Sequence, residues 1–146
     1  MRTLCGVLLL LTLGLAGCGD SDDNAATQTP EEKAQATVCN ARADIKKQVD
    51  ELKALTVSTV TIDGVKQNLD AIKNDLKAIS GAQKDLSSDR RAEVEAATKA
   101  FASSVESIAA KAVTSLSLGD AKAALVDALQ NLGQSFEDSF APLNCD

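Results

Sequence analysis

The feature that most constrains the fold is a run of apolar residues in the middle of the chain, with spacings that alternate between three and four. The run consists of Ile62, Val65, Leu69, Ile72, Leu76 and Ile79. Because an α-helix has 3.6 residues per turn, these spacings place all six side chains on one face. A strict alternation of this kind is typical of a helix that packs nearly parallel to its neighbours. We therefore expect a bundle helix here, with this stripe facing the core.

Three further segments carry apolar residues at similar spacings. They contain, respectively, Val38, Ala41, Ile45, Val49 and Leu52; Val94, Ala97, Phe101, Val105, Ile108 and Ala112; and Ala121, Leu125, Ala128, Leu132, Phe136 and Phe140. Residues 56–60 are mostly β-branched and favour an extended connection. A lone strand would have no partner, so a sheet is not expected. The sequence thus predicts an all-α fold with four helices.

Residues typical of helix ends separate the four segments. Pro30 followed by Glu31 and Glu32 suits a first helical turn, because carboxylates are favourable at the positive end of the helix dipole. Thr61 is the expected N-cap of the second helix, Ser87 or Ser88 that of the third, and residues 117–120 resemble a capping box at the start of the fourth. Gly81 lies near the end of the second helix, and Pro142 ends the fourth. Since short connections favour antiparallel neighbours, we expect an up-down-up-down four-helix bundle.

The beginning of the chain has the organisation of an export signal. Arg2 precedes a short apolar stretch, residues 4–13, which is too short to span a bilayer as a stable helix. The sequence Leu15-Ala16-Gly17-Cys18 follows. This tripartite arrangement resembles the signal peptide and lipobox of bacterial lipoproteins.

The resemblance implies a processing route and a location. In that family a signal peptidase recognises the three residues before the cysteine, here Leu15, Ala16 and Gly17, and the cysteine, here Cys18, carries the lipid. Two or three acyl chains anchor a protein stably, at roughly 0.8 kcal/mol per buried CH₂. We therefore expect an extracytoplasmic protein of the cell envelope, attached to a membrane by its lipid. Gly19 follows the cysteine, and the choice between inner and outer membrane stays open.

These signals divide the chain into three parts. Residues 1–17 are the expected signal peptide, which is removed. Residues 18–32 are the expected lipidated cysteine and a flexible tether, which is acidic and poor in apolar residues. Residues 33–146 are the expected helical bundle domain. Apart from the lipobox, this domain resembles the many small helical lipoproteins of unassigned role.

The cysteines support both the compartment and the helix count. The chain has four cysteines; Cys5 leaves with the signal and Cys18 takes the lipid. Cys39 and Cys145 remain, and an exported domain with two remaining cysteines most simply forms one disulfide. An even number of antiparallel helices brings the two to the same end of the bundle, whereas an odd number would separate them by a helix length. We expect a structural disulfide at the tether end.

Composition excludes several classes of function. The chain has no His and no Trp or Tyr, and its net charge is -6. Histidine-dependent catalysis and the usual zinc sites are thereby excluded. A nucleic-acid surface, which needs clustered cations and stacking platforms, is not expected either. No glycine-rich phosphate loop, di-iron motif or calcium loop occurs in the sequence. We expect no cofactor and no metal.

Three residue groups have a functional interpretation and a simpler structural one. Arg90 and Arg91, near a helix N-terminus, suit an anion site, but neighbouring carboxylates offer them partners. Ser103 and Ser104, with Lys99 or Lys111, suit a Ser/Lys nucleophile, although nothing fixes their geometry. The exposed face with Lys66, Asp70, Lys73, Asn74 and Lys77 suits either a partner surface or plain solvation. The structural interpretation is preferred for each.

The phenylalanines of the chain have two possible roles, and one of them implies an alternative function. Phe101, Phe136 and Phe140 are the only aromatic residues of the chain. They either fill the core or line a cavity for an apolar ligand. The preferred function is a non-enzymatic interaction or structural module that binds another envelope protein, and the alternative is a carrier of an apolar ligand. A third hypothesis is self-assembly through the stripe from Ile62 to Ile79.

Overall fold

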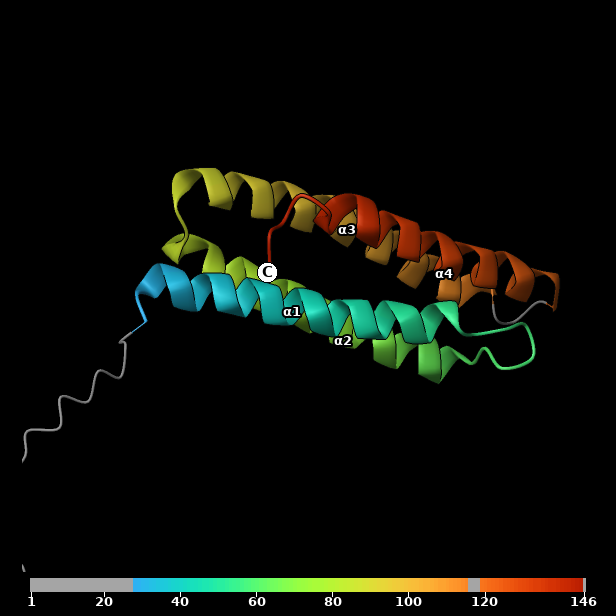
Figure 1. Ribbon diagram of the computed structural model, residues 1–146. Coiled ribbons are helices and arrows are strands. Elements are labelled where there is room, and N and C mark those ends of the chain that lie inside the picture. Colours follow the sequence, from blue (N-terminus) through green and yellow to red (C-terminus); the bar gives the residue numbers. More distant parts are fainter. Residues whose placement is uncertain (1–27, 116–118, 146) are drawn as a thin grey trace, which may run out of the picture.

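The computed structural model describes residues 28–115 and 119–145, and within these ranges the protein is a bundle of four α-helices without strands (Figure 1). The helices are α1 (Pro30–Lys53), α2 (Ile62–Ala82), α3 (Ser88–Ser115) and α4 (Gly119–Phe140), with a short 3₁₀ helix η1 (Gln83–Asp85) between α2 and α3. Each helix runs antiparallel to the one before it, and α1 also packs against α4. The predicted up-down-up-down bundle is confirmed. In this arrangement α2 and α4 lie on diagonally opposite corners.

A capping box sets the start of α1. The Thr29 hydroxyl accepts a hydrogen bond from the Glu32 N–H at 3.1 Å, and the Glu32 carboxylate accepts one from the Thr29 N–H at 2.7 Å. These bonds to Thr29 lower the pKa of Glu32. With Pro30 at the first position, the helix begins three residues before the predicted domain boundary at residue 33. Residues 30–32 are therefore the first turn of α1.

The connection between α1 and α2 is a turn, so the predicted extended segment at residues 56–60 is wrong. The Thr56 N–H donates to the Thr59 hydroxyl at 2.9 Å, and the Thr59 and Val60 N–H groups both donate to the Thr56 carbonyl. Threonine hydroxyls satisfy backbone groups locally in this way, which outweighs the preference of β-branched residues for extended structure. Val60 is buried and attaches the turn to the core.

The predicted helix ends agree with the structure where it describes them. The Thr61 hydroxyl accepts from the Gly64 N–H at 3.1 Å and caps α2. The Ser87 carbonyl accepts the first hydrogen bond of α3, from the Arg91 N–H, so Ser87 takes the N-cap position. α4 ends at Phe140, two residues before Pro142. The predicted capping box at 117–120 begins outside the described residues.

The core consists of the predicted stripes, with few changes. The expected residues of α1 and α3 are all buried, as are those of α2 from Val65 to Ile79. Ile62 is the exception in α2, because at the first position of the helix its side chain is 50% exposed. In α4, Ala128 is only partly buried, whereas Val126 and Leu129 join the core; the side chain of Ala121 lies outside the described part.

The C-terminal segment returns from α4 to α1 and is fastened there (Figure 1). Cys39 and Cys145 form the predicted disulfide, with Cα atoms 5.4 Å apart. Cys39 lies in the third turn of α1, about 14 Å from the start of the helix at 1.5 Å per residue. The disulfide therefore lies in the half of the bundle that contains the start of α1. None of the described helices combines the length and apolarity that a membrane span requires.

Candidate functional site

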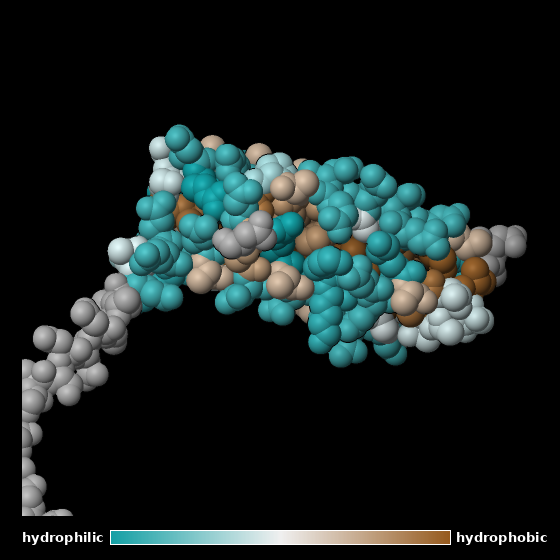
Figure 2. Space-filling model, in the orientation of Figure 1, coloured by the Kyte–Doolittle hydropathy of each residue, from teal (hydrophilic) through white to brown (hydrophobic). Residues whose placement is uncertain are grey.

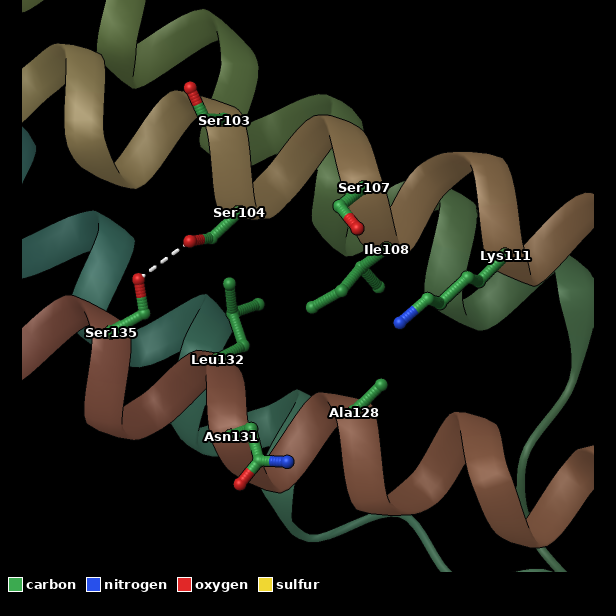
Figure 3. Close-up of a pocket in the computed structure, with 9 residues that line it drawn as sticks. All are labelled: Ser103, Ser104, Ser107, Ile108, Lys111, Ala128, Asn131, Leu132 and Ser135. Carbon is green, nitrogen blue, oxygen red and sulfur yellow. Dashed lines mark hydrogen bonds between the residues drawn. The ribbon is translucent and has the colours of Figure 1, made fainter.

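A polar groove of about 340 Å³ lies on the surface between α3 and α4 (Figure 3). We call it the serine groove. Its lining residues are Ser103, Ser104, Ser107, Ile108, Lys111, Ala128, Asn131, Leu132 and Ser135. Ile108 and Leu132 belong to the core and form an apolar floor. The walls carry hydroxyl, amide and ammonium groups, so the groove offers both donors and acceptors to a ligand.

Helical spacing brings these side chains together. Ser103, Ser107 and Lys111 are four residues apart and follow one another along one face of α3. On α4, Ala128, Asn131 and Ser135 are three and four residues apart. Both rows run alongside the core stripes of their helices, and most of their members are small. Small side chains on two adjacent helices leave a channel that larger ones would have filled.

The two ends of the serine groove differ chemically. At one end the Ser104 and Ser135 hydroxyls are hydrogen-bonded across the helices at 2.7 Å. Toward the other end, Figure 3 shows the Lys111 ammonium group extended over the space between α3 and α4. Asn131 is exposed between these two ends. The groove thus has a neutral, closed end and a cationic end.

The Ser/Lys pair that the sequence offered as an alternative is not assembled around Lys99. The Ser103 hydroxyl donates to the Lys99 backbone carbonyl at 3.1 Å, so its proton faces its own helix. The Lys99 ammonium lies 2.7 Å from the Glu95 carboxylate, which lowers the pKa of Glu95. Lys99 is therefore engaged by a carboxylate and is not placed to act as a base for a serine. Lys111 is the lysine that shares the groove with the serines.

Arg90 and Arg91 hold backbone carbonyls instead of an anion. Arg91 donates to the carbonyls of Gln83, Lys84 and Leu86 at 2.9 to 3.1 Å, where the chain turns from α2 into α3. Arg90 donates to the Asn144 carbonyl at 3.0 Å. Arg90 also lies 3.8 Å from the Glu93 carboxylate, so both guanidinium groups have partners within the protein, which supports the structural interpretation.

Arg42 gives the C-terminal segment a third attachment. It donates to the Leu143 carbonyl at 3.2 Å, beside the disulfide and the bond from Arg90. Guanidinium groups suit this role because they remain charged and present several donors in a fixed plane. The sequence analysis did not identify Arg42; its place three residues after Cys39 was the available signal.

The three phenylalanines form one packed cluster. Phe101, Phe136 and Phe140 are at most 2% exposed. The ring centroids of Phe101 lie 5.5 and 5.6 Å from those of Phe136 and Phe140, both in edge-to-face geometry. Rings at such distances fill the space between helices with one another. This packing favours the core interpretation over a ligand cavity at this position.

The remaining predicted sites are placed as follows. Leu15, Ala16, Gly17 and Cys18 lie outside the described residues. Cys39 and Cys145 are joined, as described above. Within the described ranges, no group of three or more His, Cys, Asp or Glu side chains is arranged to hold a metal ion.

One carboxylate in the contact between α1 and α2 is electrostatically unfavourable. Burial, and then the nearby Asp44 carboxylate, raise the pKa of Asp75. A carboxyl group whose pKa is higher in the folded than in the unfolded state destabilises the fold when it is ionised. That cost disappears as the pH falls through the folded-state pKa. The Asp75 contribution to stability is therefore more favourable in acid than at neutral pH.

The Asp75→Asn variant is accordingly expected to be more stable than the wild type at pH 7. The gain is expected to be below about 1 kcal/mol, the range of partly exposed charge pairs. Urea unfolding followed by circular dichroism at pH 7 and at pH 3 measures it. The gain must vanish at pH 3, where Asp75 is protonated in the wild type. A gain of equal size at both values would assign it to packing instead of charge.

Residues Asn131 and Ser135 of the serine groove were missed by the sequence analysis, although Ser103, Ser104 and Lys111 were considered. A row of small polar residues on α4, three and four residues apart beside the core stripe, was the available signal.

Comparison of the chain with protein-family models, with curated proteins and with solved structures gave no match.

Proposed function

We propose that this protein is a lipid-anchored component of the bacterial cell envelope that binds another envelope protein through the serine groove, without catalysing a reaction. The lipobox resemblance supports the anchor and the location. The lining of the groove is the single observation that carries the binding role. It combines an apolar floor, hydroxyl and amide walls and one cation in a channel between two helices.

The chemistry of the serine groove favours a polypeptide ligand. Small residues let a backbone or a helix approach closely, and the hydroxyls and the Asn131 amide can pair with its polar groups. A sugar would lack the aromatic stacking platform it usually needs, because the chain has no Trp or Tyr and its phenylalanines are buried.

The expected anchor gives the bundle limited freedom above the membrane. Residues 18–29 precede α1 and span at most roughly 40 Å when fully extended. The acidic run Asp20-Ser21-Asp22-Asp23 would be repelled by anionic headgroups. A bundle held in this way can present its long sides, including the serine groove, to a neighbouring protein.

The anchor is tested by feeding cells that express the full chain a clickable palmitate analogue. The wild type is expected to incorporate the label and to sediment with membranes. Cys18→Ser is expected to lose the label, whereas the signal-peptide control Cys5→Ser retains it. Incorporation into Cys18→Ser, or none into the wild type, would contradict the lipoprotein assignment without bearing on the groove.

The groove is tested with a photo-crosslinking amino acid in the full chain in intact cells. At Ser107, on the α3 wall, it is expected to give a discrete crosslinked species. Asn131→Arg places a bulky cation in the groove and is expected to weaken that species at least about tenfold, as a steric and charge clash would. The matched control is Gln134→Arg, the same change at an exposed amide of α4 outside the groove. Equal effects of the two arginines, or no species at all, would refute the binding role.

A further inference from the structure

The outer face of α2 carries charges in a regular order. Asp63, Lys66, Asp70 and Lys73 follow at spacings of three, four and three, which places them in one row along the helix. We call this row the charge stripe. Its residues lie next to the buried apolar stripe, and the Asp70 and Lys73 side chains are 53% and 42% exposed. Within α2 these two form only a long ion pair of 3.8 Å.

The charge stripe is complementary to itself in reverse. Counted outward from the midpoint between Lys66 and Asp70, the four charges of the stripe have opposite signs on the two sides, because Lys66 mirrors Asp70 and Asp63 mirrors Lys73. Lys77 continues the row but has no mirror residue within α2. A two-fold axis through this midpoint would lay two α2 helices antiparallel. Lys66 would then face the partner's Asp70, and Asp63 would face the partner's Lys73. By symmetry each pair occurs twice, so one contact creates four ion pairs.

An apolar hollow lies directly beside the charge stripe. It measures about 150 Å³, lies between α2 and α3, and is lined by Ile62, Lys66, Leu69, Asp70, Lys73, Ala109, Ala112 and Val113. Ile62 and Val113 are 50% and 76% exposed, and together in the lining of the hollow they form a small apolar patch. Figure 2 shows hydrophobic residues reaching the surface at this end of the bundle, away from the start of α1. The lysine methylenes of a second copy are well suited to cover such a surface.

We infer that two copies of this chain pair through α2, with their charge stripes antiparallel and with each hollow covered by the other copy. The interface differs from the self-assembly that the apolar run from Ile62 to Ile79 suggested. That run is buried inside its own bundle from Val65 onward, so only the neighbouring stripe is available to a second copy.

The pairing surface does not include the α4 wall of the serine groove. Since α2 lies diagonally opposite α4, a partner seated on α2 does not reach the α4 wall of the groove. The inference itself stands on the charge stripe of α2 and on the hollow between α2 and α3, and it does not depend on the proposed function.

The test uses two differently tagged copies of the full chain, co-purified from detergent-solubilised membranes. An acidic-stripe variant carries Lys66→Asp and Lys73→Asp, and a basic-stripe variant carries Asp63→Lys and Asp70→Lys. Wild type is expected to co-purify with wild type. Each variant is expected to lose co-purification with itself by at least about tenfold, because like charges then face each other. The acidic-stripe and basic-stripe variants are expected to co-purify with one another.

The control carries Lys33→Asp and Lys47→Asp, the same charge change on exposed residues of α1, and is expected to pair as the wild type does. Circular dichroism confirms that each variant is folded, which surface positions should allow. Three results would overturn the inference: no pairing of the wild type, undiminished pairing of either variant with itself, or failure of the two folded variants to pair with each other. Loss of pairing in the control would show that net charge, and not the stripe, is decisive.

Discussion

The free energy of unfolding is expected to fall by about 4–5 kcal/mol when Cys39 and Cys145 are both replaced by alanine. The disulfide joins residues separated by 106 positions and so closes nearly the whole bundle into one loop. A cross-link over so long a loop removes much of the conformational entropy of the unfolded chain. Urea unfolding of the oxidised wild type and of the double variant, followed by circular dichroism, measures the difference.

Reduction of the wild type supplies the control, because it breaks the same bond without changing a residue. Reduced wild type and double variant are expected to unfold at the same urea concentration. Arg42 and Arg90 donate to the Leu143 and Asn144 carbonyls; because these bonds do not involve the cysteines, we expect them to keep the C-terminal segment in place at low denaturant after reduction. A stability change below about 1 kcal/mol would show that the unfolded chain is already compact enough to make the link unimportant.

The Phe101→Ala variant is expected to lose about 3–5 kcal/mol of stability. Phe101 is fully buried and contacts both Phe136 and Phe140 edge-to-face. Truncation removes these contacts and leaves a cavity between α3 and α4 that the surrounding helices close only partly. The measurement is again urea unfolding, at neutral pH and with the disulfide intact.

Phe101→Leu serves as the matched comparison, because it keeps most of the apolar volume and should lose clearly less than Phe101→Ala. The outcome also bears on the alternative of an apolar-ligand carrier. Rings that border an open cavity would tolerate truncation, and a loss below about 1 kcal/mol would favour that alternative. A loss of the expected size supports the role of the cluster as packed core.

The four-helix fold was predictable because local periodicity and one covalent constraint point to the same answer. The stripes of α1, α2 and α3 are spaced for a single buried face, and the structure buries them almost without exception. The cysteines near the two ends of the domain's sequence required an even number of antiparallel helices, and the disulfide confirms it. Periodicity and cross-link geometry are properties of short segments and single pairs, so they are available before the tertiary structure is known.

The sequence-based predictions were wrong or incomplete where a specific hydrogen bond, or the position of a residue within its helix, outweighed a local preference. The β-branched residues 56–60 form a turn because the Thr56 and Thr59 hydroxyls bond the backbone. Ile62 fits the apolar spacing, yet the first position of α2 leaves it half exposed. α1 begins at Pro30, where a first turn was predicted, but the reciprocal bonds between Thr29 and Glu32 that cap it were not foreseen. Spacing alone contains no information about such bonds.

The amino-acid sequence by itself determined the helix count, the buried faces and the cysteine pairing, since each follows from spacing along one chain. Only the tertiary structure decided which faces become neighbours. In the structure the Ser104 and Ser135 hydroxyls are hydrogen-bonded to each other. The Lys53 side chain packs over Gly133, where an added Cβ would lie 2.5 Å from the Lys53 Cδ atom. Such contacts join residues far apart in sequence, and their partners are chosen by the packing of whole helices, which no local pattern specifies.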